Sequence, residues 1–179
     1  MARNIEIKAR IASIATLEPH VAALAQHGPE LIAQDDTFFP CAHGRLKLRT
    51  FGQGRGELIA YDRPDALGPK TSSYLITPSA DPQALRATLE RALGQSGRVV
   101  KQRWLYLIGR TRVHLDRVEG LGEFLELEVV LRDDEAAESG VEEAQALLKQ
   151  LGVQPTQLIA GAYLDLLHNK AAHDPRAAG

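Results

Sequence analysis

Four stretches of the chain alternate ionisable and apolar residues, and they most constrain the fold. They are residues 4–10, 45–49, 112–116 and 126–129. Successive side chains of a β-strand point to opposite faces, so each stretch collects its ionisable groups on one face. Several such strands in one sheet would form a wall that carries both cations and carboxylates. Cations bind a polyphosphate, and carboxylates hold the divalent metal that usually accompanies it.

The rest of the chain divides into further strands and a few helices. Short turns, such as the glycine-rich turn at 52–56, join most of the strands and predict antiparallel neighbours. Apolar residues at helical spacing predict four helices, at residues 16–26, 81–93, 141–151 and 157–167. Strands are predicted at residues 3–11, 31–40, 44–51, 56–63, 71–77, 97–108, 110–117 and 122–131.

The charged faces of these strands either meet water on an open sheet or line a closed barrel. One alternating strand taken alone is most often a solvated face. The set is different, because its charged face gathers ten cations against five carboxylates in a chain of net charge -2. The cations are Lys8, Arg10, Arg45, Lys47, Arg49, Arg63, Lys101, Arg103, Arg110 and Arg112. The carboxylates are Glu6, Glu57, Asp116, Glu126 and Glu128.

A closed barrel explains this segregation better than an open sheet does. Eight strands are about the number that closes around a small ligand, and the aliphatic alternate faces suit coverage by helices. We therefore predict an α+β fold, a closed eight-stranded antiparallel β-barrel with helices packed on the outside. Residues 1–168 would form a single domain, and residues 169–179, which are small and polar, a disordered tail.

Composition limits the partners and the compartment. A net charge of -2 gives no global field for nucleic acid or an anionic membrane, so any anion site must be local. Cys41 is the only cysteine, which excludes an intrachain disulfide and fits a reducing compartment. No apolar run approaches the roughly 20 residues that span a bilayer. These features predict a cytoplasmic protein with no nucleic-acid or membrane partner.

Three motifs resemble a known family. Glu6-Ile7-Lys8, Lys101-Gln102-Arg103 and the run from Asp116 through Gly120-Leu121-Gly122 to Glu128 resemble the CYTH, or triphosphate tunnel metalloenzyme, superfamily. The resemblance covers about residues 3–167. Class IV adenylyl cyclases, thiamine triphosphatases and tripolyphosphatases belong to this superfamily. Its fold is an eight-stranded antiparallel tunnel with outer helices, which agrees with the strand count.

The resemblance implies roles for individual residues. Together with the shared charged face, it predicts phosphate binding by Lys8, Arg45, Lys47, Arg49, Arg63, Lys101, Arg103 and Arg112. It assigns Mg2+ or Mn2+ to Glu6, Asp116, Glu126 and Glu128, although Asp116 is equally well explained as a salt-bridge partner of a neighbouring arginine. The predicted catalytic set is Glu6, Lys8, Lys101 and Arg103.

Other positions carry weaker predictions. Asn4 replaces the first glutamate of the family's opening motif, and its carbonyl can still ligate a hard cation, more weakly than a carboxylate. We interpret Asp36 as mainly structural and His114 as a polar residue of the wall. Trp104 is expected in the core under a helix, and Tyr163 at one closed end of the tunnel.

Three functions remain open at this point. The length and the motif run look most like the class IV adenylyl cyclases, which make cyclic AMP and pyrophosphate from ATP. The alternative is a hydrolase of tripolyphosphate, thiamine triphosphate or a nucleoside triphosphate. The second alternative is a non-catalytic triphosphate-binding module, which the loss of a carboxylate at Asn4 motivates. The resemblance also implies a homodimer as one assembly.

Overall fold

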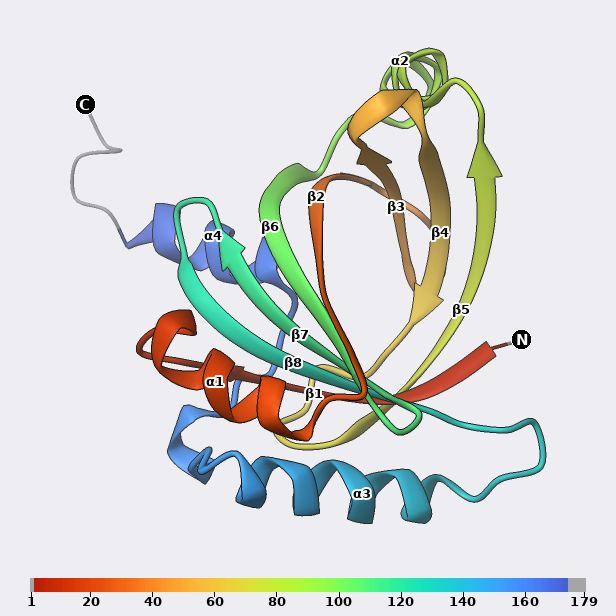
Figure 1. Ribbon diagram of the computed structural model, residues 1–179. Helices are drawn as coiled ribbons and strands as arrows, with labels where there is room; N and C mark the ends of the chain where they lie inside the picture. The colour runs from red at the N-terminus through yellow and green to blue at the C-terminus, as the bar shows by residue number, and fades with distance from the viewer. Residues whose placement is uncertain (1, 174–179) are drawn as a thin grey trace.

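Eight antiparallel strands close into a barrel in the part of the chain that the structure describes, and helices pack against its outside (Figure 1). The structure is a computed structural model, and it describes residues 2–173, apart from the side chain of Gln53. The strands are β1 (Ala2–Arg10), β2 (His27–Phe39), β3 (Arg45–Phe51), β4 (Gly56–Asp62), β5 (Lys70–Ser79), β6 (Gly97–Ile108), β7 (Thr111–Val118) and β8 (Gly122–Val130). Around the barrel they follow the order β1-β5-β4-β3-β2-β6-β7-β8, which confirms the predicted fold class.

Four α-helices accompany the barrel within residues 2–173. They are α1 (Ile14–Leu24), α2 (Pro82–Leu93), α3 (Ala137–Gln150) and α4 (Tyr163–Ala172). Helix α2 begins where the sequence predicts it. The side chain of Asp81 accepts a hydrogen bond from the backbone N–H of Ala84 at 3.0 Å, and proline occupies the first turn. None of these helices is long and apolar enough to cross a membrane.

The predicted helix at 157–167 is wrong in its boundaries. Residues Pro155–Gln157 form a single 3-10 turn, and α4 starts only at Tyr163. The start is fixed by Asp165, whose carboxylate accepts the backbone N–H of Ala162 at 2.7 Å. Helix α4 then runs to Ala172, so residues 169–172 of the predicted tail are helical. The remainder of that predicted tail, residues 174–179, lies outside the described residues.

The main core lies between the barrel and helices α1 and α3. The aliphatic faces of β1, β7 and β8 point outward into it, as the period-two pattern requires. Its fully buried members include Ile5, Val113, Leu115 and Leu127. Trp104 is partly buried against this cluster, which agrees with its predicted place. The same strands therefore turn their charged faces toward the barrel interior.

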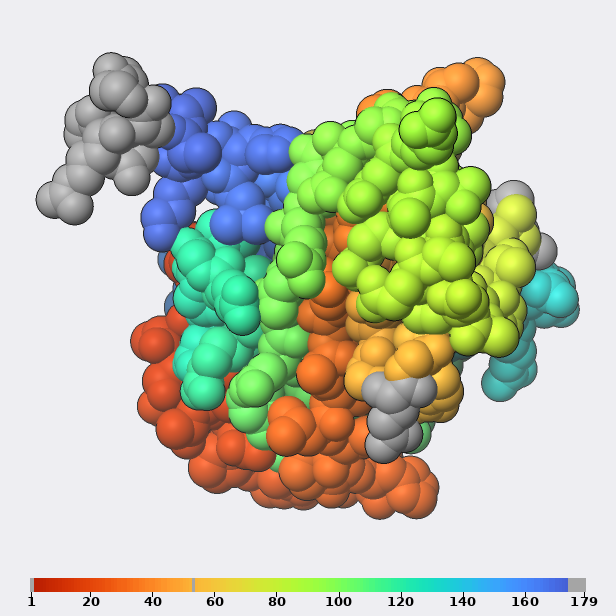
Figure 2. Space-filling view, turned by 90° about the horizontal axis from the view of Figure 1, so that it is seen from above, coloured from red at the N-terminus to blue at the C-terminus, as the bar shows by residue number. Residues whose placement is uncertain are grey.

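A second, smaller apolar cluster closes one end of the barrel. Tyr163 and Leu164 from α4 meet Phe38, Val118 and Phe124 from the strands. The rings of Phe124 and Tyr163 lie edge to face, with their centres 4.9 Å apart. Helix α4 lies beside β6 in the view from above, as its contacts require (Figure 2). The predicted role of Tyr163 at a closed end is therefore confirmed by its position.

Candidate functional site

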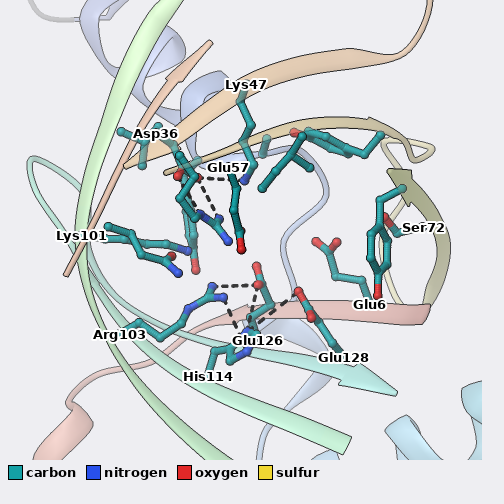
Figure 3. A pocket seen from close by; sticks show the side chains of 18 of the residues that line it. Glu6, Asp36, Lys47, Glu57, Ser72, Lys101, Arg103, His114, Glu126 and Glu128 are labelled. Carbon is teal, nitrogen blue, oxygen red and sulfur yellow. Dashed lines mark hydrogen bonds and ion pairs between the residues drawn. The ribbon is translucent and has the colours of Figure 1, made fainter. Parts of the chain in front are cut away.

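A cavity of about 400 Å³ occupies the barrel interior (Figure 3). Every strand contributes alternate residues to its lining, for example Lys47 and Arg49 from β3 and Glu126 and Glu128 from β8. Alternation alone explains this arrangement, since one face of each strand must point inward in a closed barrel. The interior is therefore built from the charged faces that the sequence pattern identified.

The cavity wall mixes charges of both signs, with cations in excess. Among the described lining residues, seven cations stand against five carboxylates and His114. The cations are Lys8, Lys47, Arg49, Arg63, Lys101, Arg103 and Arg112. The carboxylates are Glu6, Asp36, Glu57, Glu126 and Glu128. Seven of the eight predicted phosphate-binding residues are thus brought together, and the eighth, Arg45, is not among them.

Three cations of the predicted inward face lie elsewhere, each at the end of a strand. Arg45 bonds to Asp65 at 2.6 Å and to Asp165 of α4 at 2.9 Å, because α4 occupies that end of the barrel. Arg10 donates to the backbone oxygen of Leu121 at 2.7 Å. Arg110 falls in the turn before β7 and pairs with carboxylates near α3. Alternation predicts which face a side chain occupies only inside a regular strand, so it gives the wrong face for these residues at strand ends.

Asp116 lies behind the cavity wall and binds two of its cations. Its Oδ1 accepts Nε of Arg103 at 2.7 Å, and its Oδ2 accepts Nη2 of Arg103 at 2.7 Å and Nζ of Lys101 at 2.9 Å. The hydroxyl of Tyr163 also donates to Oδ2, at 3.0 Å. Burial alone would raise the pKa of Asp116, but Arg103 and Lys101 outweigh it and hold the pKa below its usual range. The salt-bridge alternative is the arrangement that the structure shows.

Asp36 repeats this arrangement on the neighbouring strands. Its Oδ1 accepts Nε of Arg49 at 2.8 Å, and its Oδ2 accepts Nη2 of Arg49 at 2.9 Å and Nζ of Lys47 at 2.8 Å. Sequence reasoning treated Asp36 as structural and missed its contact with two predicted phosphate ligands. The alternation along β2 was a signal for this position, because it places Asp36 on the same face as Gln34 and Phe38, which also line the cavity.

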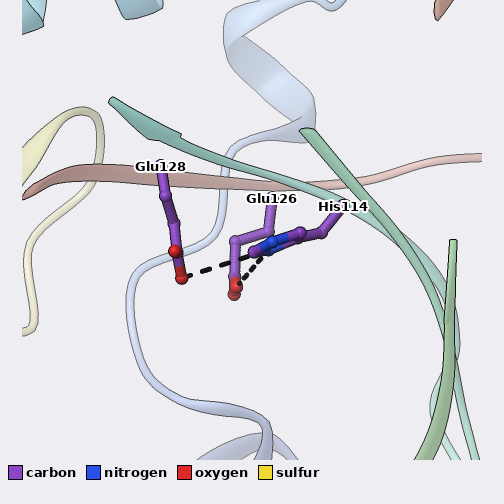
Figure 4. Close-up of side chains that lie close together, drawn as sticks. All are labelled: His114, Glu126 and Glu128. Atoms are coloured by element: carbon purple, nitrogen blue, oxygen red, sulfur yellow. Dashed lines mark hydrogen bonds and ion pairs between the residues drawn. The ribbon is translucent and has the colours of Figure 1, made fainter. Parts of the chain in front are cut away.

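A candidate metal-binding group lies beside Arg103, whose Nη2 donates to Oε1 of Glu126 at 2.9 Å. One ligand atom from each of His114, Glu126 and Glu128 lies within 4.8 Å of the others (Figure 4). Nδ1 of His114 is 3.2 Å from Oε1 of Glu126 and 4.0 Å from Oε1 of Glu128. Glu6, the remaining predicted metal ligand of the wall, pairs with Arg63. Two carboxylates beside one imidazole form a donor set that suits a divalent cation such as Mg2+ or Mn2+.

Asn4 provides an independent indication that a cation or donor belongs in this cavity. Its side chain is buried and lines the cavity, yet no described residue donates a hydrogen bond to its Oδ1. A buried carbonyl without a partner is costly, and a bound ion or its water would satisfy it. The residues present therefore fit a hard divalent metal, which the cavity would hold through Glu126, Glu128 and His114, with Glu6 as a further carboxylate ligand once it parts from Arg63.

The electrostatics keep the carboxylates ionised. Burial favours the neutral form of Glu126, but Lys8, 3.0 Å away, and Arg103 hold its pKa well below its usual range. Burial favours the neutral form of Glu128 as well, but the charge of Arg112, 2.8 Å away, helps to hold its pKa below its usual range. Burial and then Arg103 lower the pKa of His114, which leaves its ring neutral at pH 7. Neutral imidazole and ionised carboxylates are the forms that bind metals.

A closed antiparallel barrel whose inner wall carries both cations and carboxylates defines a tunnel-type barrel protein. The chain belongs to the CYTH domain family, whose model matches residues 2–163. It is 28% identical over 176 residues to the adenylate cyclase CyaB of Aeromonas hydrophila, covering 91% of this chain and 87% of that protein.

Solved structures agree on the fold. The PH1012 protein of Pyrococcus horikoshii OT3 superposes with a TM-score of 0.81 at 22% identity, covering 91% of this chain and 98% of that one. A putative adenylate cyclase of Vibrio parahaemolyticus gives a TM-score of 0.77 at 18% identity, over 92% and 97% of the two chains. An adenylyl cyclase-like protein of Hippeastrum, described as having a dominant triphosphatase activity, gives 0.66 at 17% identity, over 95% and 96%.

Proposed function

We propose that this protein is a divalent-metal-dependent enzyme that processes a triphosphate. The observation that carries the proposal is the meeting, on one cavity wall, of seven cations and the group formed by His114, Glu126 and Glu128. A triphosphate needs several cationic contacts, and its reaction needs charge stabilisation at the transferred phosphoryl group. The described wall offers both without a covalent nucleophile.

Individual residues take distinct roles in this proposal. Arginine forks bind phosphate oxygens bidentately, and lysines bind them as point charges. Glu6, Glu126 and Glu128 would hold Mg2+ or Mn2+, which supplies charge neutralisation on the phosphate oxygens. Asp116 was predicted as a fourth ligand, but its oxygens already accept four hydrogen bonds. It would have to release a partner in order to reach a metal.

The distribution of charge within the cavity favours a nucleotide over an inorganic chain. The lining residues that β4 and β5 contribute include no cation among the described side chains. Four of them are apolar or aromatic: Ile59, Tyr61, Tyr74 and Ile76. Tripolyphosphate has no apolar group to pack against such a surface. A nucleoside has an apolar ring that can pack there and a polar edge that can form hydrogen bonds. A half-charged, half-apolar cavity therefore supports a nucleoside triphosphate as substrate.

Our first candidate reaction is that of a class IV adenylyl cyclase. The 3′-hydroxyl oxygen of ATP would bond to the α-phosphorus, and the bond from that phosphorus to the bridging oxygen would break to release pyrophosphate. The relationship to CyaB and the apolar half of the cavity support this candidate. Lys8, Lys101 and Arg103 would bind the phosphates, with Lys8 held 3.0 Å from Glu126.

The second candidate is triphosphate hydrolysis, in which a water oxygen bonds to a terminal phosphorus, loses its proton to solvent, and the bond from that phosphorus to the bridging oxygen breaks to release a diphosphate. The same cations would serve it, and the description of the Hippeastrum neighbour motivates it. A non-catalytic triphosphate-binding module is the third, since Asn4 stands where the family's opening motif has a glutamate. These candidates differ in product, so one assay separates them.

The experiment incubates the purified protein with ATP, thiamine triphosphate and tripolyphosphate, each with Mg2+ and with Mn2+. Products are then separated by chromatography. Cyclic AMP with pyrophosphate establishes the cyclase, and orthophosphate with a diphosphate establishes the hydrolase. Tripolyphosphate that raises the melting temperature without any product supports the binding module, and restored activity in Asn4→Glu would confirm the cause.

Two further predictions concern the setting of the protein. The single cysteine, Cys41, is exposed, which fits a reducing cytoplasm. A homodimer is the assembly that the family resemblance implies, and light scattering on the purified chain measures it. The substrate is a small molecule in either case, and neither nucleic acid nor a membrane is needed as a partner.

A further inference from the structure

Asp36 and the two cations that it binds form a unit whose three hydrogen bonds recur at Asp116 in the same barrel wall. Asp36 in β2 lies directly opposite Arg49 in β3, and Asp116 in β7 lies directly opposite Arg103 in β6. Each arginine follows a lysine by two residues, in Lys47-Leu48-Arg49 and Lys101-Gln102-Arg103. The hydrogen bonds match atom for atom, from Nε to Oδ1 and from Nη2 and Nζ to Oδ2.

The geometry leaves each cation with donors for a ligand. Asp36 occupies only the Nε and Nη2 edge of the Arg49 guanidinium, and no described residue bonds to Nη1. Lys47 donates one hydrogen bond, to Asp36, and its ammonium has two further N–H groups. Both side chains line the cavity, and each is 15% exposed. The carboxylate of Asp36 thus holds both cations and leaves their other donors unpaired among the described residues; Asp36 and Lys47 are labelled in Figure 3.

Stability alone gives little reason for this arrangement. A buried ion pair is generally no more stabilising than well-packed apolar residues of similar volume, because desolvation offsets the attraction. Asp36 is 3% exposed and could have been replaced by an apolar residue together with its partners. A buried carboxylate that fixes two cations at a ligand-lined surface is better explained by what those cations bind.

We propose that Asp36 is a positioning residue, which holds Lys47 and Arg49 in the orientation and charge state that bind one phosphoryl group of a polyphosphate. The proposal rests on the proposed function, since it assumes a polyphosphate in the cavity. The duplicate unit at Asp116 then binds a second phosphoryl group, because β2 and β6 are neighbours in the barrel. Asp36 acts through Lys47 and Arg49 and does not touch the phosphate itself.

The charge state of Lys47 depends on the groups that surround it. Burial is the largest influence and lowers its pKa, and Arg49 lowers it further, to about 8, against the opposing effect of Asp36. Lys101 on β6 acts in the same direction as Arg49. The rings of Tyr61 and Phe38 lie 5.5 and 5.7 Å from Nζ and carry no charge at neutral pH. Asp36 is therefore the carboxylate that keeps Lys47 protonated.

The test measures proton uptake when tripolyphosphate binds, without metal and without turnover. Calorimetry at pH 7.5 in two buffers of different ionisation enthalpy gives the number of protons taken up. Before tripolyphosphate binds, about a quarter of the Lys47 side chains are neutral at this pH, because the pKa of Lys47 is about 8. In Asp36→Asn this fraction grows, so binding should take up several tenths of a proton more than in the wild type. Protons that tripolyphosphate itself gains or loses on binding are the same in both proteins, so they cancel in the difference between them.

Two controls assign the effect. Asp35 lies on the other face of the same strand, outside the cavity lining, and bonds to Arg98 at 2.6 Å and Arg86 at 3.1 Å. Asp35→Asn should leave the uptake unchanged. Adding Lys47→Arg to Asp36→Asn should cancel the extra uptake, because a guanidinium stays protonated at this pH. Equal uptake in Asp36→Asn and the wild type would overturn the proposal.

Orientation is tested by Asp36→Glu, which keeps the charge but moves it by one methylene. This variant also covers the case in which Asp36→Asn does not fold. We expect wild-type proton uptake and an affinity for tripolyphosphate that is weaker by about tenfold, since misplaced ligands lose binding. An unchanged affinity would show that the position of the carboxylate is unimportant. Failure of the wild type to bind tripolyphosphate would count instead against the proposed function.

Discussion

The hydroxyl of Tyr163 donates a hydrogen bond to Oδ2 of Asp116 at 3.0 Å, and this bond joins the closing helix α4 to the cation network of the wall. The same ring lies 3.9 Å from Nζ of Lys8 and 5.0 Å from Nζ of Lys101. Two lysines predicted to bind phosphate are thus held against one aromatic face, which attracts their charge. Tyr163 therefore links the apolar cluster at this end of the barrel to two cations of its wall.

Loss of that hydroxyl should lower stability. In Tyr163→Phe the bond to a buried, ionised carboxylate disappears, which should cost about 1.5 to 3 kcal/mol in the free energy of unfolding. Tyr61→Phe is the matched control, because Tyr61 lines the same cavity but its hydroxyl is not among the hydrogen-bond partners of Asp116. That change should stay within about 0.5 kcal/mol. Urea unfolding of both variants makes the comparison, and equal stability would show that the Tyr163 hydroxyl is not bonded to Asp116.

The barrel was predictable because one physical rule repeats in all of its strands. Alternation places one face inward and one outward, and the short turns force antiparallel pairing. The strand at 97–108, for example, was predicted with the boundaries that β6 has. The last helix was less predictable, since its start depends on the bond from Ala162 to the Asp165 side chain and not on an apolar period.

The site was predictable where a side chain stands in the middle of a strand and failed at the ends. Lys47 and Arg49 point inward by parity, whereas Arg45 on the same strand meets Asp165 of a helix whose position no local pattern reveals. Asp36 could be placed on the inner face, but its bonds to Lys47 and Arg49 depend on the register between β2 and β3. A single sequence does not specify register between strands.

Replacement of Glu128 tests the proposed metal centre. Glu128→Gln removes a charge that lies 4.0 Å from His114 and should abolish turnover while largely preserving the fold. Glu142→Gln on the exposed side of α3 is the control and should keep full activity. Product formation and circular dichroism are measured for both. Full activity in Glu128→Gln would remove Glu128 from the metal ligands.

Arg103 should contribute to substrate binding through bidentate hydrogen bonds from its guanidinium group to a phosphate. Arg103→Ala leaves Asp116 buried without its main partner and removes one of the two cations paired with Glu126, so it is expected to unfold part of the population. Arg103→Lys keeps the charge and loses the bidentate geometry, and it should raise the KM for the triphosphate about tenfold or more. Arg98→Lys, on the outer face of the same strand, should leave the KM unchanged. An unchanged KM in Arg103→Lys would place Arg103 off the substrate.

Metal preference should follow from His114. Mn2+ accepts an imidazole nitrogen more readily than Mg2+ does, so Mn2+ should raise the melting temperature more than Mg2+ at equal concentration. His114→Gln should reduce that difference. Pulsed electron paramagnetic resonance on the bound Mn2+ should detect a nitrogen coupling in the wild type that the variant lacks. A chelator should abolish turnover in the wild type, and a missing nitrogen coupling would leave carboxylates alone as ligands.

Asp36 should make the protein sensitive to acid in a defined direction. Burial would raise its pKa, but Arg49 and Lys47 outweigh burial and hold the pKa below the ordinary value of 3.8. A lowered pKa in the folded state adds stability above the unfolded value, and this stability is lost as the pH falls below it. Asp36→Asn should therefore be less stable than the wild type by about 3 to 5 kcal/mol at pH 6. Urea unfolding at pH 6 and pH 3 should show this gap narrowing, and a constant gap would mean that Asp36 is not ionised in the folded protein.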